Sequence, residues 1–509
     1  MLEPAERDRA DEPARMAQRL ITFALWAVAV AIVTGWLTLV TLHLTDDYRV
    51  AHLQGNWVAI TEVARTGHLY PPPFDGEYYA GTRWMPLAIL ANALASALVG
   101  DPLIGGKLLA AVLLVTLLVL CAAVLRQVSC PWPITAALCA SVIATETVLQ
   151  AGTTIGGDLL PVVLQVAAVA VALRRGDGAS LVFAGALAGL ALTSKLSADW
   201  ALLAVPTWLA AHRRWRAVAI FAAAAIATVA VALGAVEVIT KGGLSRHLQW
   251  FSTAGVVGTP SLWRAPNQLL YNLRGYASGA VVLLPLAVLS VLLSSGGRRL
   301  SLIHFALGYA FLLILVIYSD LGTGWNQLVD LVVLTALAVG HLAGRGSSTT
   351  SSTEGAPLRA AIALTVIWAA SLDLVRTVVL DARRSGAAVV AGQGARRATL
   401  TVAGMVRPGE ELLSEDPSIE VALGRRPIVL DPFMLTRLDR IHPEWVDPLI
   451  ARITERRFGL VVLIVSLDDP SVDYWWTDYH FGPRIAKALR QSYKFDRMVG
   501  RFYLYRPAP

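Results

Sequence analysis

Long apolar segments constrain the fold of this chain more than any other feature of its sequence. About eleven of them, each near the length that a helix needs to cross a bilayer, recur between residues 20 and 380. They lie at 20–44, 103–125, 133–150, 158–173, 179–194, 197–211, 217–239, 277–295, 301–318, 326–344 and 359–380. A further apolar stretch at 85–99 is short and opens with Pro86, so we expect a juxtamembrane or re-entrant helix there. The pattern predicts a mainly α, polytopic membrane bundle.

The composition agrees with a membrane protein. Hydrophobic residues make up 56% of the 509 residues and charged residues only 16%, and the mean hydropathy is +0.58. A soluble protein carries about a quarter charged residues. The formal net charge of +7 comes from arginines in short loops, which indicates membrane topology and no nucleic-acid partner. The three cysteines, Cys121, Cys130 and Cys139, lack the spacing of a disulfide framework or a thiolate metal site.

The arginines also predict which loops face the cytoplasm. If the N-terminus is cytoplasmic and 85–99 is not a span, the basic loops all fall on the cytoplasmic side. These loops contain Arg126, Arg174 and Arg175, residues 212–216, Arg298 and Arg299, and Arg345. Counting 85–99 as a span would place all of them outside. We therefore expect a multi-pass protein of the cell inner (plasma) membrane, with residues 1–19 cytoplasmic and an uncleaved signal anchor as its first span.

The last part of the chain changes character. Residues 381–509 alternate short apolar runs with helical patterns, which predicts a small C-terminal α/β domain. The expected strands are 412–416, 427–431, 460–466 and 501–505, and the expected helices are 418–423, 443–457 and 483–491. The predicted topology makes this domain extracytoplasmic. It follows a transmembrane domain at 20–380, whose first outer loop is 45–102.

The first outer loop carries the most informative motif. Asp46 and Asp47 follow the first span directly, and ionisable residues are costly so close to lipid, which indicates a working site. The loop continues with Glu62, Arg65-Thr66-Gly67-His68-Leu69-Tyr70-Pro71-Pro72, Tyr78-Tyr79, Arg83-Trp84 and Pro86. This order resembles the first extracytoplasmic loop of the GT-C glycosyltransferases, in particular bacterial relatives of protein O-mannosyltransferases and aminoarabinose transferases. The resemblance becomes weaker toward residue 345 and is loose in the C-terminal domain.

This resemblance implies a membrane glycosyltransferase of the GT-C type that inverts configuration and moves a hexose or pentose from a polyprenyl-phosphate carrier. The acceptor would be a lipid, glycan or protein of the cell envelope, reached on the outer face of the membrane. By the resemblance Asp46 is the general base for the acceptor hydroxyl, and Asp47 orients it or binds a cation. The alternative is that the pair only caps a juxtamembrane helix at 48–65.

Two further residues have counterparts in the resembling families. Asp158 opens the fourth span at a point where those families have an acidic residue on the outer face. It would contact the acceptor or share a divalent cation, Mg or Mn, with Asp46 and Asp47. Lys195 matches a lysine that contacts the carrier phosphate in aminoarabinose transferases. The alternatives are a helix cap for Asp158 and a lysine that snorkels at a helix end for Lys195.

The remaining substrate-binding candidates lie mainly in the first loop. Relatives often carry a lysine before the loop proline, whereas this chain has Met85. That departure leaves open which cation helps Lys195, and Arg83 is the candidate. His68 and Tyr79 complete the set, although a histidine in a turn is more often structural. Asp320 and Asn326 flank another outer loop and are predicted to line the same cavity. The loop 240–276 interleaves cations with aromatics, which suits lipid headgroups and sugars or an ordinary interfacial belt.

Other functions find less support in the sequence. No P-loop, dinucleotide fingerprint or zinc spacing is present, and the predicted cytoplasmic loops are short, so a lipid-linked donor fits better than a nucleotide-sugar. The first alternative is a transporter or flippase of lipid-linked saccharides, which would show charges near mid-membrane and symmetry between its halves. The second is a non-catalytic scaffold that binds cell-wall glycan. No cofactor is expected beyond the divalent cation.

Overall fold

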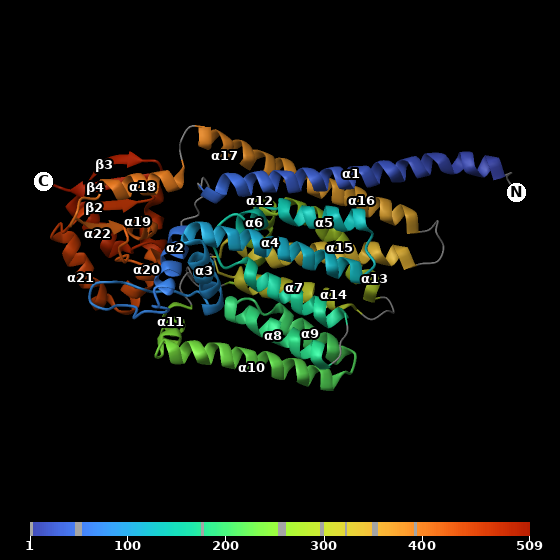
Figure 1. Cartoon of the computed structure of the whole chain (residues 1–509), viewed down its shortest axis with the longest axis horizontal. Coiled ribbons are helices and arrows are strands. Elements are labelled where there is room, and N and C mark those ends of the chain that lie inside the picture. The colour runs from blue at the N-terminus through green and yellow to red at the C-terminus, as the bar shows by residue number, and fades with distance from the viewer. Residues whose placement is uncertain are drawn as a thin grey trace.

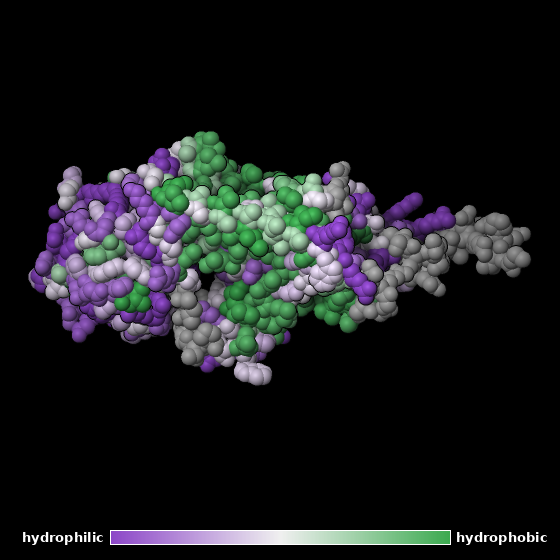
Figure 2. Space-filling view, turned by 90° about the horizontal axis from the view of Figure 1, so that it is seen from below, coloured by the Kyte–Doolittle hydropathy of each residue, from purple (hydrophilic) through white to green (hydrophobic). Residues whose placement is uncertain are grey.

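Most of the chain forms helices that run side by side along the long axis of the molecule, and the sheet-bearing C-terminal domain lies at one end of them (Figure 1). The computed structural model describes residues 4–45, 53–174, 178–252, 261–295, 300–320, 323–348, 355–390 and 394–509. In the space-filling view the surface of the helical bundle is largely hydrophobic and that of the C-terminal domain largely hydrophilic (Figure 2). This division suits one part in lipid and the other in water.

Every segment that the sequence predicts as a span is helical. The helices are α1 (Pro4–Thr45), α4 (Pro102–Gln127), α5 (Trp132–Ala144), α6 (Glu146–Ala151), α7 (Leu159–Arg174), α8 (Gly178–Ser194), α9 (Trp200–Ala211), α10 (Trp215–Ile239), α13 (Ser278–Ser295), α14 (Leu302–Ile317), α15 (Val329–Ser348) and α16 (Gly355–Asp373). In the part of the chain that the structure describes, 5 helical stretches are long and apolar enough to cross a membrane, and the others are shorter apolar helices. The prediction of a polytopic helical membrane protein is confirmed.

Three features of the described bundle depart from simple spans. The predicted span 133–150 is divided at Thr145 into α5 and α6, and α15 begins after a 3₁₀ turn at Trp325–Leu328. After α16 the helix continues through a π-helix at Leu374–Val379 into α17 (Leu380–Val390). The C-terminal domain begins beyond it with α18 (Ala395–Met405).

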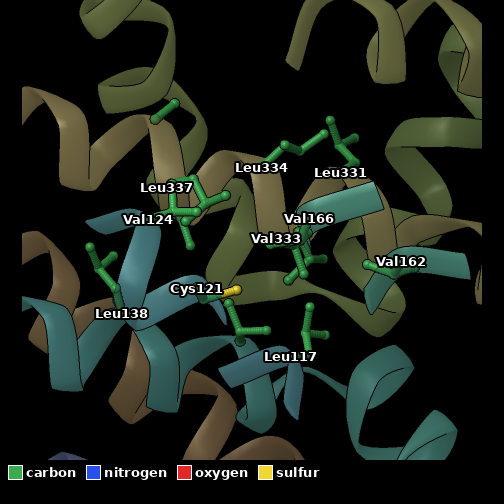
Figure 3. Packing of buried hydrophobic residues seen from close by; sticks show 14 of the residues in the cluster. Leu117, Cys121, Val124, Leu138, Val162, Val166, Leu331, Val333, Leu334 and Leu337 are labelled. Atoms are coloured by element: carbon green, nitrogen blue, oxygen red, sulfur yellow. The ribbon is translucent and has the colours of Figure 1, made fainter. Parts of the chain in front are cut away.

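The interior of the bundle is formed by α4, α5, α7 and α15, whose apolar side chains interdigitate (Figure 3). The labelled residues are Leu117, Cys121, Val124, Leu138, Val162, Val166, Leu331, Val333, Leu334 and Leu337. Small residues let some helices approach closely. For example, Gly185 on α8 faces the backbone oxygen of Phe221 on α10, and a side chain there would meet that oxygen. The three cysteines are free.

Shorter helices lie between the bundle and the C-terminal domain: α2 (Leu53–Arg65), α3 (Pro86–Val99) and α11 (Gly243–Phe251) (Figure 1). Another short helix, α12 (Ala265–Tyr276), packs against α13 and α14 of the bundle. Pro86 occupies the first turn of α3, and Gly100 ends it in the left-handed conformation at φ 83°. With 14 residues, α3 is about 21 Å long, which is shorter than the hydrocarbon core of a bilayer. Its exposed Leu90, Leu94 and Leu98 form one apolar face, as expected of a helix that lies at the membrane surface.

The C-terminal domain contains a sheet of 4 strands in the order β1-β2-β4-β3. Its remaining elements are β1 (Glu411–Ser414), α19 (Ser418–Ala422), α20 (Pro432–Ile441), α21 (Pro443–Thr454), β2 (Phe458–Leu463), a 3₁₀ turn (Pro470–Val472), a π-helix (Trp475–Tyr479), α22 (Pro483–Ser492), β3 (Tyr493–Val499) and β4 (Phe502–Pro507). Strands β1 and β2 are parallel, and the other neighbours are antiparallel.

One strand prediction in this domain is wrong, and one strand was missed. The segment 427–431 is not a strand of the sheet, because Val429 pairs only through an isolated bridge with Tyr79 of the first loop. Strand β3 was not predicted, because as an edge strand it exposes charged residues such as Lys494 and Arg497 and lacks an apolar run.

Candidate active site

An ion pair marks the end of the bundle that faces the C-terminal domain. Lys195 Nζ, just beyond α8, lies 2.7 Å from Asp158 Oδ1 at the start of α7, and their side chains are 22% and 27% exposed. Asn326 Nδ2, in the turn before α15, donates to the same oxygen at 3.0 Å. The fold therefore brings together three polar residues that are far apart in the sequence.

The loop that carries Asp158 is packed closely against its neighbours. Asn92 on α3 donates to the carbonyl of Gly156 at 3.0 Å. A Cβ added at Gly157 would lie 2.8 Å from the indole ring of Trp57 on α2, which is closer than real Cβ atoms come. The sequence needs glycine at this point because α2 and α3 press on the loop, and this packing fixes the position of Asp158.

A second acidic residue lies one helical turn beyond Asn326. Asp330 Oδ1 accepts a hydrogen bond from the indole nitrogen of Trp200 on α9 at 2.7 Å. Asp330 is within electrostatic range of both Lys195 and Asp158. The cation of Lys195 is thus set among carboxylates, which hold it in place while part of its surface stays accessible.

Arg83 lies between the bundle and the C-terminal domain. Its guanidinium carbon is 4.9 Å from the centre of the Phe433 ring on α20, a cation–π contact. Burial lowers the pKa of Arg83, whereas the nearby carboxylates Asp431 and Asp320 raise it. An arginine stays charged under such opposing influences, so Arg83 is a fixed positive group beside the C-terminal domain.

Stacked tryptophans connect Arg83 with the loop of Asp158. The rings of Trp84 and Trp57 stack with their centres 4.3 Å apart and an interplanar angle of 16°. Because Trp57 also packs on Gly157, the neighbours of Arg83 and of Asp158 belong to one packed region. The candidates Arg83, Asp158 and Lys195 therefore lie at the same end of the bundle.

The other two first-loop candidates occupy different surroundings. Tyr79 is 3% exposed, and its hydroxyl donates to the carbonyl of Trp445 at 2.9 Å. Burial raises its pKa to about 12. His68 is exposed in the turn after α2, with Nδ1 3.5 Å from Thr66 Oγ1. Tyr79 thus fastens the loop to the C-terminal domain and His68 lies at the surface; that either binds substrate stays a prediction.

The predicted catalytic pair, Asp46 and Asp47, lies outside the described residues. The preceding end of α1, at Thr45, is at the end of the bundle that faces the C-terminal domain (Figure 1). Near that end His43 Nε2 lies 3.1 Å from Ser385 Oγ on α17.

A metal centre also stays a prediction. Within the described ranges no group of three or more His, Cys, Asp or Glu is arranged to hold a metal ion. Carboxylate oxygens are suitable ligands for Mg or Mn. One oxygen of Asp158 already accepts from Lys195 and Asn326. The ligands of a metal ion would therefore have to be the other oxygen of Asp158 and the carboxylates of Asp46 and Asp47.

Asp431 was not predicted from the sequence, and His247 was predicted only as one of the cations and aromatics of the loop 240–276. His247 on α11 is fully buried, accepts from the Thr82 amide at 3.2 Å through Nδ1 and donates to the Pro71 carbonyl at 2.7 Å through Nε2. Burial lowers its pKa to about 4, so the ring is neutral. Asp431 accepts from Asn56 Nδ2 at 2.9 Å. These contacts join segments at least 165 residues apart in the chain, and no local sequence signal reports such distances.

This chain resembles known proteins in its three-dimensional structure. No protein-family model and no curated protein matches the sequence. The crystal structure of ArnT from Cupriavidus metallidurans bound to undecaprenyl phosphate is similar over 94% of this chain and 97% of that chain, with a TM-score of 0.59 and 11% identity. The apo structure of ArnT is similar over the same shares, with a TM-score of 0.53 and 13% identity. The chain therefore shares the fold of the ArnT structures, which is the GT-C fold implied by the resemblance of the first outer loop.

Proposed function

We propose that this protein is a membrane glycosyltransferase that passes a sugar from a polyprenyl-phosphate carrier to an acceptor of the cell envelope on the outer face of the membrane. The observation that supports this most is the cluster of Lys195, Asp158 and Asn326 at one end of a GT-C fold. The ArnT structure with undecaprenyl phosphate supports the class of donor.

Lys195 is the group that we assign to the carrier phosphate. When the bond between the sugar and the phosphate breaks, negative charge grows on the departing oxygen. An ammonium held at that point lowers the energy of this charge, because a fixed cation needs no reorganisation during the reaction. Lys195 has three N–H donors, and among the described residues it uses one, toward Asp158, so two are available there for phosphate oxygens. Asp158 and Asn326 keep the lysine oriented.

Asp46 is the group that we assign to the acceptor. Its carboxylate takes the proton of the acceptor hydroxyl as the hydroxyl oxygen attacks the anomeric carbon from the face opposite the phosphate. The new glycosidic bond forms while the sugar–phosphate bond breaks, so the anomeric configuration inverts. Asp47 orients Asp46. A divalent cation held by Asp46, Asp47 and Asp158 would supply further positive charge for the phosphate.

The experiment that tests the proposal compares the envelope glycans of a deletion strain with those of its parent. We expect the deletion strain to lack one sugar on one acceptor, and the intact gene to restore it. The gene carrying Lys195→Ala should restore less than a tenth of the modification. The same substitution at Lys487, an exposed lysine on α22, is the matched control and should restore it fully. Unchanged glycans in the deletion strain would contradict the proposal.

A further inference from the structure

Aromatic side chains of the C-terminal domain gather on the side that faces Arg83. Phe433 on α20 and Tyr479 at the end of the π-helix stack with ring centres 6.2 Å apart and an interplanar angle of 23°. Trp475, in the first turn of that π-helix, lies 6.2 Å from Tyr479 at 34°. All three side chains are partly exposed, whereas the adjacent Trp476 is fully buried in the core. We call Phe433, Trp475 and Tyr479 the aromatic platform.

Buried polar contacts within the C-terminal domain hold the rings of the platform in place. The indole nitrogen of Trp475 donates to Glu415 Oε1 at 2.6 Å. The same carboxylate lies 2.8 Å from His480 Nδ1, and both of these side chains are almost fully buried. Behind Tyr479, Thr436 Oγ1 donates to its carbonyl at 3.3 Å. Rings that are locked before a ligand arrives lose little conformational entropy on binding.

Charged groups lie on and beside the platform on the side of the bundle. The guanidinium of Arg83 lies over Phe433 at 4.9 Å. Asp320, in the loop that leads to Asn326, is within electrostatic range of both Arg83 and Tyr479. Burial, together with Asp478 and Asp320, raises the pKa of Tyr479, so its phenol keeps its proton and can donate a hydrogen bond.

Flat aromatic faces bordered by hydrogen-bonding groups suit one class of ligand in particular. A pyranose ring has a face of C–H bonds that packs on aromatic rings, and its hydroxyls point sideways to donors and acceptors. An acyl chain has no hydrogen-bonding group to offer to Arg83 and Asp320. A saccharide satisfies both the apolar and the charged part of the surface.

We propose that the aromatic platform binds a sugar ring of a saccharide acceptor and presents its hydroxyl toward the site of Lys195 and Asp158. This inference rests on the proposed function and adds the chemical class of the acceptor. The donor phosphate is assigned to the bundle and the platform belongs to the C-terminal domain. The two substrates therefore approach from different sides, as an inverting displacement requires.

The test uses membranes of the deletion strain, which contain the unused donor and acceptor, mixed with purified full-length protein in detergent. Transfer is the rate at which the missing glycan returns, measured with limiting membranes. Tyr479→Ala and Phe433→Leu should each lower this rate roughly tenfold, the loss expected from removing one stacking contact. Tyr479→Phe keeps the ring and should stay within about twofold of the wild-type rate. Phe495→Ala removes an aromatic residue that is 49% exposed on edge strand β3 and should leave the rate unchanged.

Binding of undecaprenyl phosphate, followed by native mass spectrometry, separates the platform from the donor site. It should be unchanged in all four variants. Wild-type rates for both Tyr479→Ala and Phe433→Leu would overturn the platform, and so would loss of undecaprenyl phosphate binding in both, which indicates a merely structural role. An acceptor without a sugar ring would also overturn it. If wild-type protein itself returns no glycan, the proposed function fails and the platform with it.

Discussion

Lys195 and Asp158 form an ion pair at 2.7 Å in which both side chains keep about a quarter of their surface exposed. Exposed pairs of this kind contribute about 0–1 kcal/mol to the free energy of unfolding. The fold therefore gains little stability from placing these charges at the end of an apolar bundle. Ligand binding therefore explains the presence of these charges beside a membrane helix better than the stability of the fold does.

Replacement of Lys195 by alanine should impair binding more than folding. We expect undecaprenyl phosphate to bind at least tenfold more weakly, because the phosphate loses its cation. The melting temperature in detergent should change by no more than a few degrees. Native mass spectrometry and intrinsic fluorescence measure the two effects. A variant that melts far below the wild type would instead indicate that Lys195 is structural.

Asp46→Asn should separate chemistry from binding. The amide keeps the shape of the carboxylate but does not accept a proton, so transfer should fall by about 10²–10⁴-fold. Undecaprenyl phosphate should still bind as it does to the wild type. Rates measured with deletion-strain membranes test this expectation, and Asp101→Asn, at the cap of α4, provides a control. Transfer at the wild-type rate would remove Asp46 as the general base.

At the residue scale the sequence predicted candidates but not their contacts. The resemblance points to Asp158 and Lys195, and the structure adds the ion pair between them. The sequence offers Arg83 as a nearby cation, but its partner Phe433 lies 350 positions later in the chain, where no local pattern points back to the loop. The roles of these residues in catalysis stay predictions.

Among the structural elements, the first outer loop is held from several sides. Tyr79 donates its backbone amide to Ile428 and accepts from Leu430, both at 2.8 Å. Tyr70 donates its hydroxyl to the Trp84 carbonyl at 2.6 Å. His247 binds the backbone at both ends of the intervening segment. Residues 70–84 of this loop are therefore held in one position beside the site.

His247 should make the stability of this loop depend on pH. Its pKa is about 4 in the fold, against 6.5 for an unperturbed histidine, so the unfolded state binds the proton first as pH falls. The contribution of His247 is complete above pH 6.5 and is lost as pH falls toward 4, by up to about 1.4 kcal/mol per pH unit. Melting temperatures between pH 7 and 4.5 should fall less in His247→Gln than in the wild type. Equal slopes would contradict this account.

The glycine loop before Asp158 offers a matched pair of variants. A methyl group at Gly157 meets the Trp57 ring, whereas one at Gly156 meets nothing within 4 Å. We expect Gly157→Ala to destabilise the fold by about 1–3 kcal/mol and to slow transfer, because Trp57 or the loop must move. Gly156→Ala should resemble the wild type. Similar melting temperatures and rates for both variants would show that the packing does not position Asp158.

The elements themselves were predicted well where the apolar pattern is long. The spans follow from hydropathy, and the short helix 85–99 follows from its length and from Pro86. The segment 427–431 misled the prediction because its pairing partner is Tyr79, outside its own domain. Strand pairing across domains depends on tertiary position, which a single sequence does not contain.

The N-terminus and the C-terminus of the chain lie at opposite ends of the molecule, because α1 begins at the end of the bundle farthest from the C-terminal domain (Figure 1). Contacts such as Asn56 with Asp431 and Asp75 with Arg426, at 2.9 and 2.8 Å, join the first loop to that domain. We expect the loop and the domain to move as one unit. The prediction that the C-terminal domain is extracytoplasmic then applies to the first outer loop as well.

Labelling of single cysteines tests this topology. The native cysteines are buried or partly buried, so a membrane-impermeant maleimide should react with them slowly. Lys494→Cys, on edge strand β3, should react in intact spheroplasts. Arg214→Cys, in the turn between α9 and α10, should react only after the membrane is permeabilised. The reverse pattern would place the C-terminal domain in the cytoplasm and contradict the proposed outer site.

The central claim is that Lys195 binds the phosphate of a polyprenyl carrier at the end of the bundle that faces the C-terminal domain. The most direct measurement is an electron cryo-microscopy map of the full-length protein in nanodiscs with undecaprenyl phosphate. We predict phosphate density within hydrogen-bonding distance of Lys195 Nζ, with the lipid chain running along the bundle. Phosphate density at the opposite end of the bundle, or beside the C-terminal domain away from Lys195, would contradict the account.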